Sequence, residues 1–182
     1  GKYGNLSGTS MATPLVAGLV AFLKAQDANL TGAEIKALLQ TTGAQVQIQT
    51  ACNCRIDAFS AVDTLMSKKA WIVPAAATLA EKSTLQLAMK NASGEVKFES
   101  SNPSVATVDT AGVLTAVSVG NVVVKATDAS GATAQTLSIY VGSGTSSSPS
   151  QPTPPSNPDP GTPPSDGSCP LGDANLCQIM CQ

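Results

Sequence analysis

The run Gly8-Thr9-Ser10-Met11-Ala12-Thr13-Pro14 places a serine hydroxyl where an apolar helix is expected to begin. The first backbone N–H groups of a helix have no acceptor within it, and the positive end of the helix dipole lies there. An oxyanion formed beside Ser10 would be stabilised at this point. Gly8 allows unusual backbone dihedrals, and Pro14 lies near the helix start, where its missing N–H costs little. The alternative is the ordinary role of such a serine, an N-cap.

The same run, followed by Val16-Ala17-Gly18, resembles the catalytic-serine motif of the subtilase family, and the resemblance extends over about residues 1–67. It implies that Ser10 is the nucleophile of a serine endopeptidase and that its backbone N–H is one oxyanion donor. It also implies supporting roles for Gly8, Thr9, Met11 and Pro14. Met11 would lie beside the nucleophile, although a role as core filler fits equally well.

Two departures from the family pattern affect what is expected of this chain. Leu15 stands where the family usually has a His directly after the Pro, and we expect it to alter packing rather than chemistry. More importantly, the chain contains no His. In subtilases the nucleophile follows an Asp and a His in sequence. The resemblance therefore implies that these residues, and the Asn of the oxyanion hole, lie upstream in an N-terminal part of the catalytic domain, and that this chain alone is inactive.

Three helices are expected to position the serine. The first runs from Ser10 to about Lys24 and is apolar all round from Leu15 onward, which is typical of a helix buried in a larger domain. The second begins at Thr31-Gly32-Ala33-Glu34, a capping box, and should bury Ile35, Leu38 and Leu39. The third is capped by Asp57, with Phe59, Val62 and Met66 at helical spacing.

Residues 70–142 alternate in polarity and contain regular turn signals, which predicts a small all-β module. The segments Ser100–Asp109 and Gly112–Ala116, with Gly120, resemble a bacterial Ig-like domain of group 2. Phe98 stands in place of the usual Trp. The resemblance implies either attachment to a cell surface, matrix or polymer, or a spacer; we favour the spacer, because the module has few aromatic residues, such as Tyr140, beyond the core Phe98.

Composition predicts an α+β multidomain chain. The resemblances imply that residues 1–69 are the helical C-terminal part of a subtilase α/β catalytic domain and that residues 70–142 are a small all-β Ig-like sandwich. Eight of the 26 residues in 143–168 are Pro, which predicts a disordered linker. Residues 169–182 form a tail that contains cysteines.

The five cysteines, Cys52, Cys54, Cys169, Cys177 and Cys181, are expected to form disulfides in an exported protein. A bridge between Cys52 and Cys54 would be strained, so we expect other partners for them. Zinc is set aside because there is no His and the spacing lacks paired knuckles. No cofactor is required, and structural calcium is implied by the family resemblance alone.

Net charge is −2 and the longest apolar run, Leu15 to Leu23, has nine residues. The charge argues against nucleic acid as a partner, and the short apolar run argues against a membrane span. Any export signal would lie upstream of Gly1, and we expect a secreted or cell-surface bacterial protein that acts on polypeptides. Two alternatives remain open. The chain could be a secreted structural or adhesive protein with an inactive protease remnant, or a cleavage product that stays docked to its N-terminal half.

Overall fold

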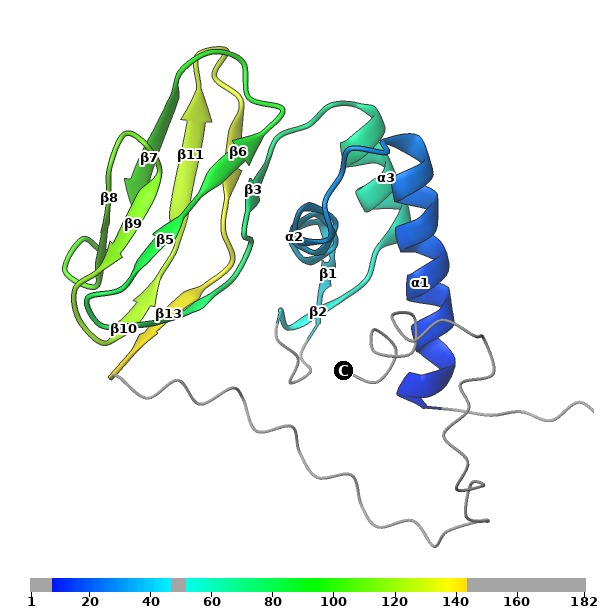
Figure 1. Ribbon diagram of the computed structural model, residues 1–182, viewed down its shortest axis with the longest axis horizontal. Helices are drawn as coiled ribbons and strands as arrows, with labels where there is room; N and C mark the ends of the chain where they lie inside the picture. Colours follow the sequence, from blue (N-terminus) through cyan, green and yellow to red (C-terminus); the bar gives the residue numbers. More distant parts are fainter. Residues whose placement is uncertain (1–7, 47–51, 144–182) are drawn as a thin grey trace, which may run out of the picture. The chain divides into compact units, whose positions relative to one another are not determined.

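The computed structural model describes residues 8–46 and 52–143, all within one compact unit, Gly1–Ser146. Figure 1 shows the helices in the N-terminal part of the chain and most of the short strands after them. The helices are α1 (Thr9–Gln26), α2 (Gly32–Thr42) and α3 (Ala58–Met66). Their number and positions confirm the sequence prediction. The linker and the tail predicted beyond residue 143 lie outside the described residues.

Local capping explains where the second and third helices begin. Thr31 Oγ1 accepts from the Glu34 N–H at 3.3 Å, and Glu34 Oε2 accepts from the Thr31 N–H at 2.6 Å, which completes the predicted capping box. Asp57 accepts from the Ser60 N–H at 3.0 Å and so caps α3, also as predicted. In α2 the expected residues Ile35, Leu38 and Leu39 are buried.

The face that α3 buries differs from the expected one. Ala61 and Leu65 are buried, whereas Phe59 and Met66 are 81% and 59% exposed. Residues four apart lie on one side of a helix, so burial of Ala61 and Leu65 turns positions 59 and 66 outward. The helical core is built by ten buried residues: Leu23, Leu30, Ile35, Ala37, Leu38, Leu39, Ala61, Leu65, Trp71 and Ala75.

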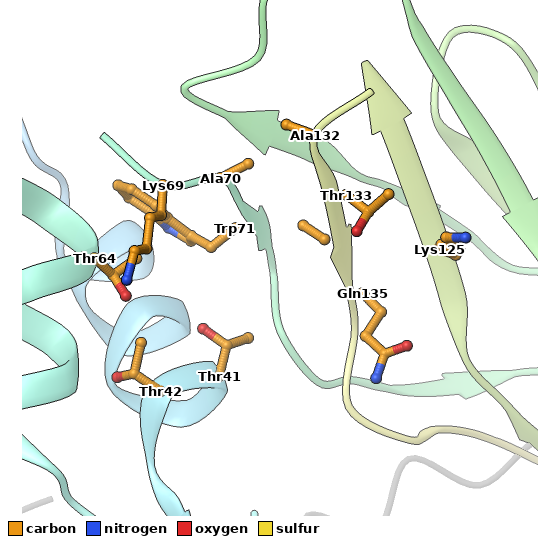
Figure 2. A pocket seen from close by; sticks show the side chains of 11 residues that line it. Thr41, Thr42, Thr64, Lys69, Ala70, Trp71, Lys125, Ala132, Thr133 and Gln135 are labelled. Atoms are coloured by element: carbon orange, nitrogen blue, oxygen red, sulfur yellow. The ribbon is translucent and has the colours of Figure 1, made fainter. Parts of the chain in front are cut away.

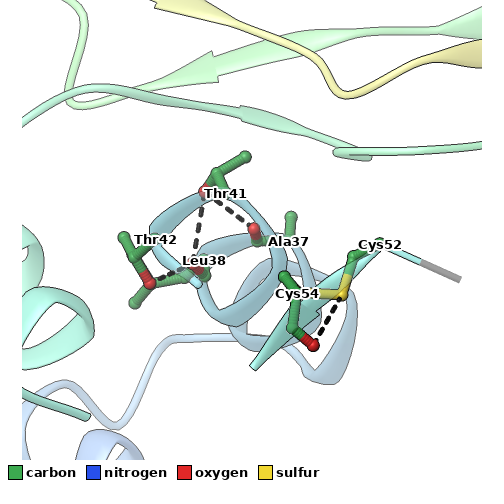
Figure 3. Close-up of a disulfide and its surroundings, with 6 residues drawn as sticks. All are labelled: Ala37, Leu38, Thr41, Thr42, Cys52 and Cys54. Atoms are coloured by element: carbon green, nitrogen blue, oxygen red, sulfur yellow. Dashed lines mark hydrogen bonds between the residues drawn. A yellow bond between two sulfur atoms is a disulfide. The ribbon is translucent and has the colours of Figure 1, made fainter. Parts of the chain in front are cut away.

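The expectation for Cys52 and Cys54 is wrong, because the structure joins them in a disulfide (Figure 3). Their Cα atoms are 5.0 Å apart, within the usual range for a bridge. Asn53 between them has a φ of 47°, a left-handed conformation that Asn tolerates better than most residues. The bridge adjoins a small antiparallel pair, β1 (Ala44–Gln45) and β2 (Cys54–Arg55).

The rest of the described chain is an all-β module built of short strands. Its strands are β3 (Trp71–Val73), β4 (Thr78–Ala80), β5 (Thr84–Gln86), β6 (Ala88–Lys90), β7 (Val96–Ser100), β8 (Ala106–Val108), β9 (Val113–Ala116), β10 (Gly120–Val122), β11 (Val124–Asp128), β12 (Thr133–Gln135) and β13 (Ile139–Gly142). They pair in the orders β10-β13-β4, β12-β11-β7, β3-β6 and β5-β9-β8. β13 and β4 are parallel, and the other pairs are antiparallel.

This module has a hydrophobic core of its own. Twelve buried side chains form it, among them Ile72, Leu87, Leu114, Val124 and Ile139, with Phe98 partly buried against them. Alternation along β11 places Val124, Ala126 and Asp128 inward and Lys125 outward, as a strand with one wet face requires. The described residues thus contain two cores, one helical and one between strands.

Candidate active site

Ser10 is the second residue of α1, and Gly8 is the N-cap. The Met11 N–H donates to the Gly8 carbonyl at 3.1 Å, and the Ala12 N–H approaches the same oxygen at 3.4 Å. The N–H groups of Thr9 and Ser10 come before the first residue that can bond back within the helix. Ser10 is therefore not the cap, and its exposed side chain and backbone N–H lie together at the positive end of α1.

Pro14 and Thr13 shape the first turn around Ser10. Pro14 is the sixth residue of α1, so its missing N–H removes the usual helical donor to the Ser10 carbonyl. This position lies further into the helix than the first turn, where a proline would remove no bond. Thr13 Oγ1 donates to the Thr9 carbonyl at 2.9 Å. The backbone around Ser10 consequently has one helical hydrogen bond fewer than the same turn of an ordinary helix.

Gly8 supplies the backbone geometry that starts this turn. Its φ of 143° lies in a region that residues with a Cβ rarely adopt, and the space around a Cβ at this position is open among the described residues. The requirement for glycine is therefore one of backbone conformation rather than of space.

Among the described residues, no acidic or basic side chain is hydrogen-bonded to Ser10, and most of α1 beyond it is apolar and exposed. Met11, Leu15 and Phe22 are 42%, 77% and 49% exposed, and Leu23 is the one buried residue that α1 contributes. No group of three His, Cys, Asp or Glu residues that could hold a metal exists in the described ranges. The described residues thus place a serine hydroxyl and a backbone N–H without a helical acceptor at the start of α1, and supply no base beside them.

Two cavities lie away from the serine. An apolar groove of about 380 Å³ is bounded by α1, α2 and the disulfide, with Val16, Val20, Ile35, Leu39 and Ile56 among its lining residues. A second cavity, of about 530 Å³, is lined by residues such as Thr42, Thr64, Trp71 and Gln135 (Figure 2). Neither includes Ser10.

A carboxylate with two sets of partners lies at the start of α2. Lys90 Nζ lies 2.6 Å from Glu34 Oε1, while the other carboxylate oxygen accepts from Thr31. The hydrogen bond from Lys90, followed by that from the Thr31 backbone, lowers the pKa of Glu34 to about 2. The capping box was visible in the sequence, but the pairing with Lys90 was not.

Comparison with known proteins assigns both parts of the chain. Residues 1–54 match the model of the subtilase family, and residues 65–139 match that of the bacterial Ig-like domain, group 2. The chain therefore carries, in this order, a segment that matches the subtilase family and a segment that matches a bacterial Ig-like domain. No curated protein matches the chain as a whole or in part. Within the described ranges, no helix has the length and apolar character needed to cross a membrane.

Three solved structures resemble part of the chain. An intimin mutant of EHEC O157:H7 is 30% identical over 35% of this chain and 34% of its own, with a TM-score of 0.32. The intimin–Tir90 complex gives 28% identity, 35% of each chain and a TM-score of 0.33. A GH10 xylanase from termite gut with a bacterial Ig-like domain is 18% identical over 36% of this chain and 18% of its own, with a TM-score of 0.32. The chain thus spans about a third or less of each.

Proposed function

We propose that this chain is part of a secreted, subtilisin-type serine endopeptidase in which Ser10 is the nucleophile. The observation that carries the proposal is the placement of the Ser10 hydroxyl and N–H at the open N-terminal turn of α1, within a segment that matches the subtilase family. Bacterial Ig-like and subtilase domains are commonly extracellular, which supports export. The reaction itself needs no cofactor, and structural calcium is proposed by family likeness alone.

In the proposed reaction, Ser10 Oγ attacks the carbonyl carbon of a peptide bond while a base takes the hydroxyl proton. The resulting oxyanion accepts a hydrogen bond from the Ser10 N–H; loss of one such donor typically lowers the rate by about 10²- to 10³-fold. The base then protonates the leaving amine, and water hydrolyses the acyl-enzyme. In subtilases this base is a His; since the chain has no His, we propose that the base comes from outside these 182 residues.

The exposed apolar surface of α1 supports the proposal that another part of the catalytic domain packs on this helix. A helix that is apolar on all sides is stable when it is covered, and α1 leaves Leu15 and Phe22 largely exposed. We propose that the part of the catalytic domain carrying the Asp, His and Asn covers this surface, and that the chain without it is inactive.

A second candidate is adhesion or attachment through the Ig-like module, with the protease segment inactive. It is favoured by the module's own complete core, which is independent of any catalytic residue. In this alternative Ser10 would have no chemical role.

Labelling with a fluorophosphonate probe distinguishes the two candidates. We expect native material that contains the complementing catalytic part to be labelled at Ser10, and the isolated chain to remain unlabelled. Ser10→Ala should abolish labelling. Ser60→Ala is a matched control, because Ser60 also lies in the first turn of a helix, and should leave labelling unchanged. Absence of label on Ser10 with the complementing part present would rule out the protease function.

A further inference from the structure

Strand β3 has two buried faces, and each belongs to a different core. Trp71 is 3% exposed and packs in the helical core with Leu38 and Leu65, and Val73 lies against the same cluster. Ile72, between them, is fully buried in the core of the Ig-like module. Successive side chains of a strand point to opposite faces, so β3 is shared between the two cores.

The neighbouring strand repeats this division. β6 pairs antiparallel with β3 so that Lys90 lies opposite Trp71 and Met89 lies opposite Ile72. Directly opposed residues share a face of the sheet. Met89 accordingly packs on the core of the module, whereas Lys90 points to the helices and pairs with Glu34 of α2. One face of the β3–β6 pair, defined by Trp71, Val73 and Lys90, is therefore covered by α2.

Further contacts close the same interface. Asn91 Nδ2 donates to the Lys69 carbonyl at 3.1 Å, just after α3. Ala75 is fully buried in the helical core, while its carbonyl accepts from the Leu137 N–H at 2.7 Å, just before β13. The interface thus combines buried apolar side chains, an ion pair and hydrogen bonds, whereas a flexible tether would need none of them.

We propose that the Ig-like module is a permanent folding partner of the subtilase segment, docked through the β3–β6 face, rather than an independent spacer. Removing the module would expose the helical core by taking away Trp71 and Ala75. Because Leu23 of α1 belongs to that core, the module also supports the helix that carries Ser10. The consequence for catalysis rests on the proposed function, but the docking itself does not.

Amide hydrogen exchange on the full 182-residue chain tests the docking. Val124 is fully buried in the module's core, so Val124→Ala should weaken that core. If the module and the helices open together, protection of the slowest amides should fall by the same factor, about tenfold, in β11 and in α2. Val119→Ala makes the same change at a position 48% exposed and should leave both unchanged.

The same exchange measurement also defines the result that would overturn the docking. A loss of protection confined to β11, with α2 unchanged, would overturn the proposal, because it would show that the helices fold without the module. Should Val124→Ala fail to fold, Ile139→Val removes a single methylene from the same core and provides the same comparison. Since no catalytic partner is needed, failure of this test leaves the assignment of Ser10 untouched.

Discussion

At the scale of single residues, Glu34 carries more interactions than its place in a capping box indicates. One carboxylate oxygen satisfies the Thr31 N–H, and the other pairs with Lys90 of β6. The first contact was predictable because it depends on residues three apart. The second depends on which strand folds over α2, and no local pattern in the sequence specifies that strand.

Glu34→Gln should make the chain less stable at neutral pH but not at low pH. The folded-state pKa, about 2, lies below the ordinary value of 4.5, so the charged carboxylate stabilises the fold above pH 4.5. This stabilisation is lost as pH falls from about 4.5 toward 2. Because Lys90 is partly exposed, we expect a difference of about 1 kcal/mol at pH 7.

Denaturant unfolding of both proteins at several pH values measures this difference. Glu81→Gln, at an exposed position, should show a much smaller change. A deficit of Glu34→Gln that persists undiminished near pH 2 would contradict the assigned role of the charge.

At the scale of elements, the sequence predicted the three helices well, because caps and apolar periodicity are local signals. It failed where the outcome depends on packing. Phe59 and Met66 are large and apolar, yet α3 turns Ala61 and Leu65 inward, where Leu65 fills the helical core and the small Ala61 allows close packing. Cys52 and Cys54 pair because Asn53 adopts a left-handed conformation, which spacing alone did not reveal.

The turn before β9 provides a test at this scale. Gly112 has a φ of 80°, and a Cβ there would lie 2.6 Å from the Leu87 carbonyl oxygen and 3.0 Å from Phe98 Cε2. Gly112→Ala should therefore destabilise the module by about 2 kcal/mol or more, through both dihedral strain and overlap.

Gly131→Ala is the matched control for that measurement. Gly131 has a similar φ of 86°, with open space where a Cβ would be among the described residues. It should cost about 1 kcal/mol, the dihedral contribution alone. Equal free energies of unfolding for the two variants would show that the contact with Leu87 is unimportant.

At the scale of the molecule, the two parts of the chain bury their apolar residues to different extents. The Ig-like module closes a core of twelve buried residues. The helical segment shares Trp71 with the module and leaves most of α1 exposed. The sequence predicted both the helices and the β module, since each has its own apolar period. Their shared strand was missed, because three residues are too few to show which face meets which neighbour.

Leu15→Glu should separate the stability of the chain from its assembly with the rest of the catalytic domain. Leu15 is 77% exposed, so the change should alter the free energy of unfolding of the isolated chain by no more than about 0.5 kcal/mol. Leu23→Ala, at a fully buried position of the same helix, should lower the free energy of unfolding by about 2 to 5 kcal/mol.

If the complementing part covers α1, however, Leu15→Glu places a charge in that interface and should lower fluorophosphonate labelling of Ser10 at least about tenfold. Undiminished labelling of Leu15→Glu would show that this face of α1 stays open to water in the assembled protein.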